Sequence, residues 1–180
     1  MFTLEVNEDI YLRMLSARDA EDMFTLIDTS REYLRRWLPW IEETKQVEDS
    51  LEFIKHTFYA YNNRQGLTAG IFYRDTFVGV IGYNRLDFTN HIGTIGYWLG
   101  EKYQHQGIMT KTVAAITTYG FEELRLNRIE IRVAPENKSS IAIPERLQFT
   151  KEGTLRQAEK LYDRYVDHHL FSMLKEEWKQ

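Results

Sequence analysis

The segment from Ile92 to Thr110 constrains the fold of this chain more than any other. It begins as an apolar run ending near Leu99, typical of a buried strand, continues through a short polar loop and opens a helix at about Ile108. The first backbone N–H groups of a helix have no partner within it, and the helix dipole adds about half a positive charge there. A strand, a glycine-containing loop and a helix start therefore predict an anion site.

The spacing of glycines narrows the choice of anion. No G-x-x-x-x-G-K-[ST] phosphate loop is present, and no G-x-G-x-x-G follows a strand. Gly93, Gly96 and Gly100 lie inside or at the end of the apolar run, where glycine indicates a bulge or a close backbone approach. From the pattern alone, an ordinary strand-to-helix turn without a ligand is an equally good interpretation.

Composition limits the class of protein. The 180 residues suit one domain, over 1–180, with a sizeable core, and the net charge of −4 argues against general nucleic-acid binding. The absence of cysteine excludes disulfides, thiolate metal ligands and cysteine nucleophiles. No apolar run reaches the roughly 18 residues that span a bilayer, and the N-terminus lacks the features of a signal peptide. We expect a cytoplasmic protein that binds neither nucleic acid nor membrane.

Hydrophobic periodicity predicts the elements before the Ile92 strand. They are a strand over 10–14, helices over 16–29 and 47–64, and strands over 67–73 and 77–86. Ser16 to Asp19 matches a capping box at the first helix start, and Gly66 suits the left-handed position after the second. The residues 74–76 form a hairpin signal, and 87–90 a second turn.

The elements beyond the loop complete an α+β pattern. They are a helix from 108 to about 126, a strand over 128–133, a short helix from about 138, and strands over 150–155 and 165–174. No repeat or linker indicates a domain boundary. The order β-α-α-β-β-β-α-β-α-β-β fits a central, mixed and mostly antiparallel twisted sheet flanked by helices.

Two segments resemble the GNAT acetyltransferases (Gcn5-related N-acetyltransferases). Gln104, Gly107 and the following helix resemble the family's Q/R-x-x-G-x-G/A pyrophosphate loop, with Met109 in place of the final glycine or alanine, and 97–99 resembles its bulged strand. The run from Asn137 to Phe149 resembles its N-x-x-S…E-x-x-G-F segment, with Gln148 replacing the glycine.

The ends of the chain narrow the resemblance. Trp37-Leu-Pro-Trp40 and Tyr165-Val-Asp-His168 are similar to the ribosomal-protein N-terminal acetyltransferase branch, the RimJ/RimL-like group. The resemblance implies the GNAT fold and acetyl-CoA as co-substrate, without a metal. The residues it implies for the cofactor are Trp98, Leu99, Gln104, His105, Gln106, Gly107, Ile108, Met109, Thr110 and Asn137. Backbone N–H groups from Gln104 to Met109 would wrap the pyrophosphate, and a long side chain at Met109 is compatible with this if it points away.

The resemblance also implies the catalytic groups. Ser140 would protonate the leaving sulfur and Glu159, expected between the last two strands, would be the base, with Glu42 and Glu43 as rival carboxylates. Without the resemblance, Ser140 is a first-turn helix serine and Glu159 a solvated loop carboxylate. The absence of cysteine favours direct attack in a ternary complex; an acyl-serine has no visible His/Asp support.

Local chemistry around Ser140 adds two expectations. Asn137 is expected at the N-cap of the short helix. Pro144 lacks the N–H that would have bonded the Ser140 carbonyl, so that carbonyl is expected to be free for cofactor or water. His168 and His169 are adjacent on a strand, face opposite sides and cannot chelate one metal together.

The acceptor is less constrained. Trp37, Trp40 and Glu42 are expected to line its pocket, although the tryptophans fit a core contact equally well. A free α-amino group has a pKa of about 7.7–8.0 and a lysine about 10.4, so a modest base favours a protein N-terminus. The alternatives are a small amine such as a polyamine or drug, or a non-catalytic acyl-CoA-binding module, against which Asn137 and Ser140 weigh. Exposed aromatic residues would allow a homodimer.

Overall fold

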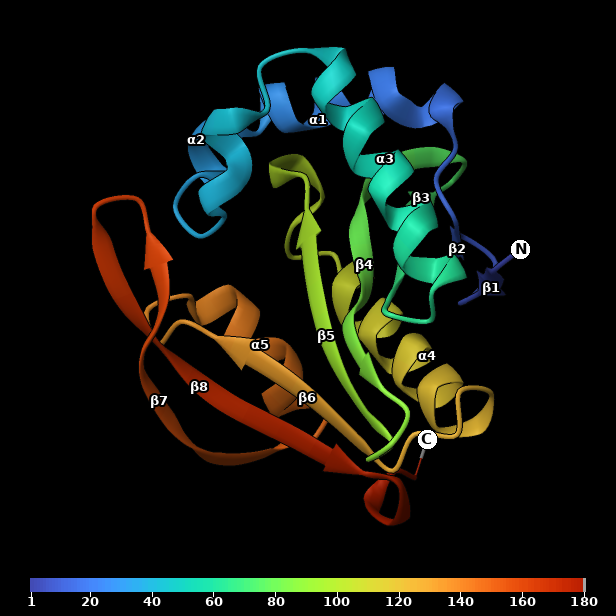
Figure 1. Ribbon diagram of the computed structural model, residues 1–180, viewed down its shortest axis with the longest axis vertical. Coiled ribbons are helices and arrows are strands. Elements are labelled where there is room, and N and C mark those ends of the chain that lie inside the picture. The colour runs from blue at the N-terminus through green and yellow to red at the C-terminus, as the bar shows by residue number, and fades with distance from the viewer. Residues whose placement is uncertain (180) are drawn as a thin grey trace.

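The computed structural model describes residues 1–179, which form one mixed sheet flanked by helices (Figure 1). The strands are β1 (Thr3–Glu5), β2 (Ile10–Arg13), β3 (Leu67–Tyr73), β4 (Thr76–Asp87), β5 (Ile92–Leu99), β6 (Arg128–Val133), β7 (Thr150–Leu161) and β8 (Arg164–Leu174). Their order across the sheet is β1-β2-β3-β4-β5-β6-β8-β7, and only β5 and β6 pair in parallel. The predicted α+β class and mostly antiparallel sheet are confirmed.

Helices cover both faces of the sheet. They are α1 (Ala20–Thr29), α2 (Arg31–Leu34), α3 (Val47–Asn62), α4 (Ile108–Glu122) and α5 (Lys138–Arg146), with 3-10 turns η1 (Ala17–Asp19), η2 (Pro39–Glu43), η3 (Glu101–Tyr103) and η4 (Lys175–Glu177). One core holds α1 and α3 residues with Phe77 and Trp98, and the other holds α4 and α5 residues with Ile95 and Ile131. None of the helices within residues 1–179 is long and apolar enough to cross a membrane.

The parallel strands β5 and β6 separate partway along their length. They pair from Ile92 with Arg128 to Ile95 with Ile131, although β5 continues to Leu99 and β6 to Val133. Figure 1 shows the two strands diverging toward their carboxyl ends. Open α/β sheets bind ligands beyond the carboxyl ends of such strands. Because β5 and β6 separate, the loop that follows β5 lies opposite the start of α5, which follows β6.

The turns before β5 differ from one expectation and agree with another. Arg64 (φ 57°), not Gly66, takes the left-handed position after α3. Gly66 has another reason to be glycine, because a Cβ there would lie 2.8 Å from the carbonyl oxygen of Tyr83. The predicted hairpin between β3 and β4 is confirmed, since Arg74 and Asp75 both have positive φ, as a type I′ turn requires.

The final hairpin is longer than predicted. Strand β7 runs to Leu161 and not to Leu155 as predicted. Residues 156–158 form a bulge opposite Asp167, and the pairing with β8 resumes beyond it at Glu159. Gln157 has φ 48° and donates its backbone N–H to the Asp167 carboxylate at 2.7 Å. The bulge and the largely exposed, polar side chains of β7 hide its alternation from sequence reasoning. Glu159 therefore lies in a strand opposite Val166, and its placement in a loop was wrong. The short edge strand β1 was also missed.

Candidate active site

The loop between β5 and α4 presents unpaired backbone donors. Gly107 is the N-cap of α4 with φ 76°, and nothing lies within 4 Å of where its Cβ would be. Within residues 1–179, the backbone N–H groups of residues 105–110 donate to no protein acceptor. Successive free N–H groups at a helix start can hold an anion. The sequence predicted free N–H groups from Gln104 to Met109; the Gln104 N–H is instead bonded to the Glu101 carbonyl.

The side chains of Gln104 and Met109, two residues of this loop, turn toward the protein. The Gln104 N–H donates to the Glu101 carbonyl at 3.2 Å and its side-chain amide to the Leu99 carbonyl at 3.0 Å, so Gln104 braces the loop against β5. Met109 is only 7% exposed and its side chain packs in the core beneath the helix start. A long side chain is compatible here because it is buried in the core.

A hollow of about 70 Å³ connects this loop to the start of α5. Of the residues predicted to bind the cofactor, it brings together Trp98, Leu99, Gln104, Met109 and Asn137. His105, Gln106 and Gly107 are exposed on the loop and Ile108 is buried beneath it. The Thr110 hydroxyl accepts a hydrogen bond from Arg146 at 3.3 Å. Asn137 occupies the N-cap position of α5, as expected, but its side chain makes no cap hydrogen bond.

A larger cleft of about 470 Å³ opens on the other side of Ser140. Its walls come from β4, β5, β6, the η2 region and the final hairpin, and include Trp37, Trp40 and Glu159. The residues that line both cavities are Trp37, Leu38, Tyr97, Trp98, Asn137 and Ser140. The small hollow and the large cleft therefore meet at Ser140.

The carbonyl of Ser140 accepts a hydrogen bond from Tyr97, a residue that had no predicted role in the site. Pro144 leaves this carbonyl without its helical donor, and the Tyr97 hydroxyl donates to it at 3.1 Å. The expectation of a carbonyl free for cofactor or water was wrong. Burial raises the pKa of Tyr97 well above its ordinary value and outweighs the opposing effect of this hydrogen bond, so Tyr97 stays a neutral donor.

Glu159 has a partner in the cleft. Its Oε1 lies 3.5 Å from Nε2 of His168 on β8, and the two side chains are 35% and 16% exposed. His169 turns to the opposite face, where its Nδ1 lies 2.9 Å from the Thr154 hydroxyl, as strand alternation predicted. No local signal could pair Glu159 with His168, because the bulge in β7 sets their relative position.

Asn84 is a second residue missed from sequence. It lies at a register shift between β4 and β5 and lines the larger cleft. A Cβ on Gly96 would lie 2.1 Å from its side-chain amide. Gly96 thus permits a close approach, as its position suggested, but the bulge falls on β4 and not on 97–99 of β5.

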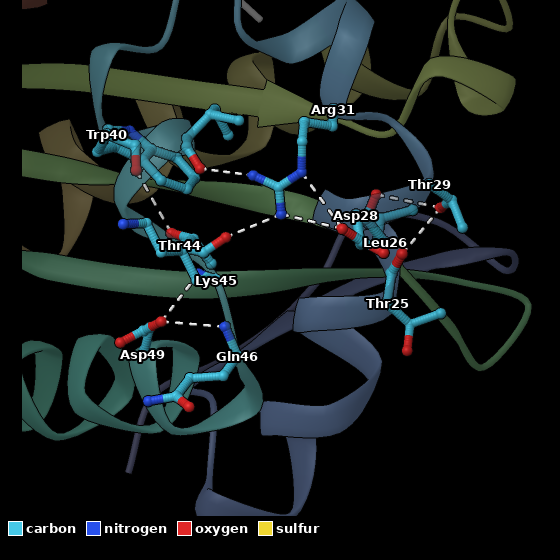
Figure 2. Close-up of polar contacts among 11 residues, drawn as sticks. Thr25, Leu26, Asp28, Thr29, Arg31, Trp40, Thr44, Lys45, Gln46 and Asp49 are labelled. Carbon is cyan, nitrogen blue, oxygen red and sulfur yellow. Dashed lines mark hydrogen bonds and ion pairs between the residues drawn. The ribbon is translucent and has the colours of Figure 1, made fainter.

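The segment that carries the tryptophans is held by Arg31 (Figure 2). Its guanidinium donates to the carbonyls of Ile41 and Thr44 at 2.7 and 2.8 Å and contacts the Asp28 carboxylate at 3.0 Å. Trp40 packs against Trp98 with ring centroids 6.1 Å apart while it lines the cleft. Trp40 is therefore both a wall of the cleft and a core contact.

The same segment touches the tip of the final hairpin. The Tyr162 hydroxyl donates to the Leu38 carbonyl at 2.9 Å, and Arg35 lies 5.8 Å from the centre of the Tyr162 ring. Two segments far apart in sequence thus meet at the edge of the larger cleft.

Glu42 does not line either cavity. It is exposed and pairs with Arg35 at 2.7 Å. In a 3-10 helix only residues three apart share a face, so Trp40 and Glu42 on η2 point in different directions. Glu43 is also absent from the cleft walls, which leaves Glu159 as the cleft's carboxylate. Residues 1–179 contain no group of three or more His, Asp or Glu placed to hold a metal ion.

Comparison with known proteins agrees with this geometry. Residues 9–150 match the family model of the acetyltransferase (GNAT) domain. YdaF of Bacillus subtilis (strain 168), provisionally named a ribosomal N-acetyltransferase, is 37% identical over 99% of this chain and 98% of its own length.

Two solved structures share the whole fold. The microcin C7 self-immunity acetyltransferase MccE, in complex with acetyl-CoA and AMP, is 30% identical with a TM-score of 0.90 over 94% of each chain. RimL, the ribosomal L7/L12 alpha-N-protein acetyltransferase, in complex with coenzyme A, is 25% identical with a TM-score of 0.92 over 96% of this chain and 98% of that one. The chain therefore belongs to the GNAT acetyltransferase family and is an acetyl-CoA-dependent N-acetyltransferase.

Proposed function

We propose that this enzyme acetylates the N-terminal α-amine of a protein, with a ribosomal protein as the leading acceptor. The observation that carries the proposal is the meeting of the two cavities at Ser140. One cavity leads from the loop of free N–H groups, and the other offers about 470 Å³ for an acceptor. The names of the related YdaF and RimL proteins support the acceptor class.

The cofactor side fits acetyl-CoA. The free N–H groups of residues 105–110 would hold the pyrophosphate, and Trp98, Leu99 and Asn137 would line the path of the pantetheine arm. Acetyl-CoA supplies an activated acetyl thioester. The separation of β5 and β6 leaves the end of β5 without a neighbouring strand on that side. Apart from the Leu99 carbonyl, which accepts from Gln104, the backbone groups that face this side are available to the arm.

The chain's own groups serve the transfer from opposite sides of the junction. Ser140 would give its hydroxyl proton to the departing sulfur, while Tyr97 holds the turn of α5 that carries Ser140. Glu159, which lines the larger cleft, would help remove the proton of the amine. Direct attack in a ternary complex needs no further nucleophile.

A small amine is the second candidate acceptor. The larger cleft has an aromatic wall of Trp37, Trp40 and Phe53, and aromatic faces stack planar rings or cations. The related MccE structure contains AMP, a small molecule with a planar base.

The experiment that separates these candidates is an acceptor panel followed by coenzyme A release. Peptides with free N-terminal serine or alanine, their N-terminally blocked counterparts, and spermidine would be compared at equal concentration. The proposal expects turnover that disappears on blocking the N-terminus. Turnover with spermidine alone would overturn the protein acceptor and favour the second candidate.

A further inference from the structure

We propose that His168 is a catalytic residue, and that the His168–Glu159 pair, not Glu159 alone, accepts the proton of the incoming amine. The inference deepens the proposed function, since it rests on an amine acceptor in the larger cleft. It starts from one geometric fact, the 3.5 Å separation of Glu159 Oε1 and His168 Nε2.

The position of His168 is built by the fold. Strand β8 turns its side chain into the cleft, and the bulge at 156–158 in β7 brings Glu159 beside it. His168 is 16% exposed, which limits its freedom while leaving the ring open to the cleft. Its Nε2 faces the Glu159 carboxylate, and within residues 1–179 its Nδ1 has no protein hydrogen-bond partner. One ring nitrogen thus faces a carboxylate, and the other has no protein partner. A histidine that acts as a general base has this arrangement.

The chemistry favours an imidazole over a carboxylate for this task. General-base efficiency is greatest when the pKa of the base lies near the working pH. An ordinary imidazole has a pKa near 6.5 and an ordinary glutamate near 4.3, against 7.7–8.0 for an α-ammonium. A carboxylate beside the imidazole fixes its tautomer and stabilises the imidazolium that forms.

The surroundings of the pair are sparsely charged. The other charged side chain lining the larger cleft is Arg132 from β6, and it contacts the Glu130 carboxylate at 3.4 Å. Tyr97 from β5 is the remaining titratable group of the lining, and it is neutral. On β8 the flanking His169 faces away. Glu159 is therefore the anion that faces His168.

The proton transfers balance. With Nε2–H facing the Glu159 carboxylate, Nδ1 takes one proton from the ammonium, which leaves a neutral amine and an imidazolium. The amine attacks the thioester carbonyl, the C–N bond forms and the C–S bond breaks. Ser140 gives its proton to sulfur and regains one from the nitrogen of the new amide. The imidazolium then returns its proton to solvent.

The first test needs no acceptor. Ring ¹⁵N chemical shifts distinguish the two neutral tautomers of histidine, and the His168 signals are assigned by their loss in His168→Gln. The inference expects the Nε2–H tautomer in the wild-type protein and a mixture of tautomers in Glu159→Ala. A His168 ring that is Nδ1–H, or that does not respond to Glu159→Ala, would overturn it.

The second test measures rate. With whichever amine of the acceptor panel is turned over, His168→Gln is expected to lower kcat at least roughly tenfold while the KM for acetyl-CoA stays within about twofold. The matched control is His169→Gln, expected within about twofold of wild type. The double variant with Glu159→Gln should lose little more than either single variant, because the pair acts as a unit.

The outcomes separate this inference from the proposed function. Unchanged kcat in His168→Gln removes His168 from catalysis, whatever the acceptor. Turnover of spermidine but not of peptides overturns the protein acceptor, and the rate test then proceeds with spermidine. If no amine of the panel is turned over, the tautomer result alone decides the pairing of His168 and Glu159.

Discussion

The two sides of the active site are built in opposite ways. The proposed pyrophosphate site is one continuous segment, residues 105–110, and offers mainly backbone N–H groups at the start of α4. The proposed acceptor site is assembled from side chains of distant elements, among them Asn84, Trp40, Glu159 and His168. A backbone site tolerates side-chain replacement and is sensitive to backbone geometry, and a site made of side chains has the reverse sensitivities.

This difference sets the largest predicted effect. Gly107→Pro is expected to raise the KM for acetyl-CoA by roughly thirtyfold or more, because proline fixes φ near −65° where the loop needs 76°, and removes one of the free N–H groups. Initial-rate kinetics at saturating acceptor would measure it. Gly153→Ala is the control, since Gly153 lies on β7 with open space where a Cβ would be. A wild-type KM in Gly107→Pro would remove the loop from cofactor binding.

Glu159, the carboxylate of the larger cleft, should affect the turnover rate and not the affinity for acetyl-CoA. Glu159→Gln is expected to lower kcat at least about tenfold near neutral pH, since general-base help is worth roughly 10²–10⁴ in rate, with acetyl-CoA affinity retained. Calorimetric titration with acetyl-CoA and steady-state rates would measure the two quantities separately. The surface-exposed Glu42→Gln is the matched control, and equal losses in both variants would contradict the assignment.

The contacts of Arg31 with the Ile41 and Thr44 carbonyls should matter for binding of the acceptor and not for binding of acetyl-CoA. Arg31→Ala leaves the carbonyls of Ile41 and Thr44 without their donor and loosens the segment that carries Trp40. We expect the acceptor KM to rise about fivefold and the free energy of unfolding to fall by about 1–3 kcal/mol. Kinetics and denaturant unfolding would be compared with Arg18→Ala, an exposed residue outside these contacts. A selective rise in the acetyl-CoA KM would argue against this separation of the two sides.

The smallest effect is expected at the junction of the cavities. Pro144→Ala restores a backbone N–H that competes with the Tyr97 hydroxyl for the Ser140 carbonyl. We expect kcat to fall about two- to threefold, with a similar loss in Tyr97→Phe and no further loss in the double variant. Additive losses would show that the two residues act independently.

The same difference explains what sequence reasoning could and could not reach. The loop with free N–H groups could be predicted because its strand, glycine and helix start are consecutive, and periodicity located most elements. The length of β7 could not be predicted, because the bulge at 156–158 is defined by how β7 pairs with β8 around Asp167. Tyr97 on β5 meets Ser140 on α5 through the packing of a helix on a strand, and His168 on β8 meets Glu159 on β7 through sheet register. Short-range patterns contain neither.

The contact between Tyr162 and Leu38 couples two parts of the larger cleft that are far apart in the sequence. The Tyr162 hydroxyl joins the tip of the final hairpin, which carries Glu159 and His168, to the segment that carries Trp37 and Trp40. A change in the position of either segment is therefore passed to the other through this one hydrogen bond.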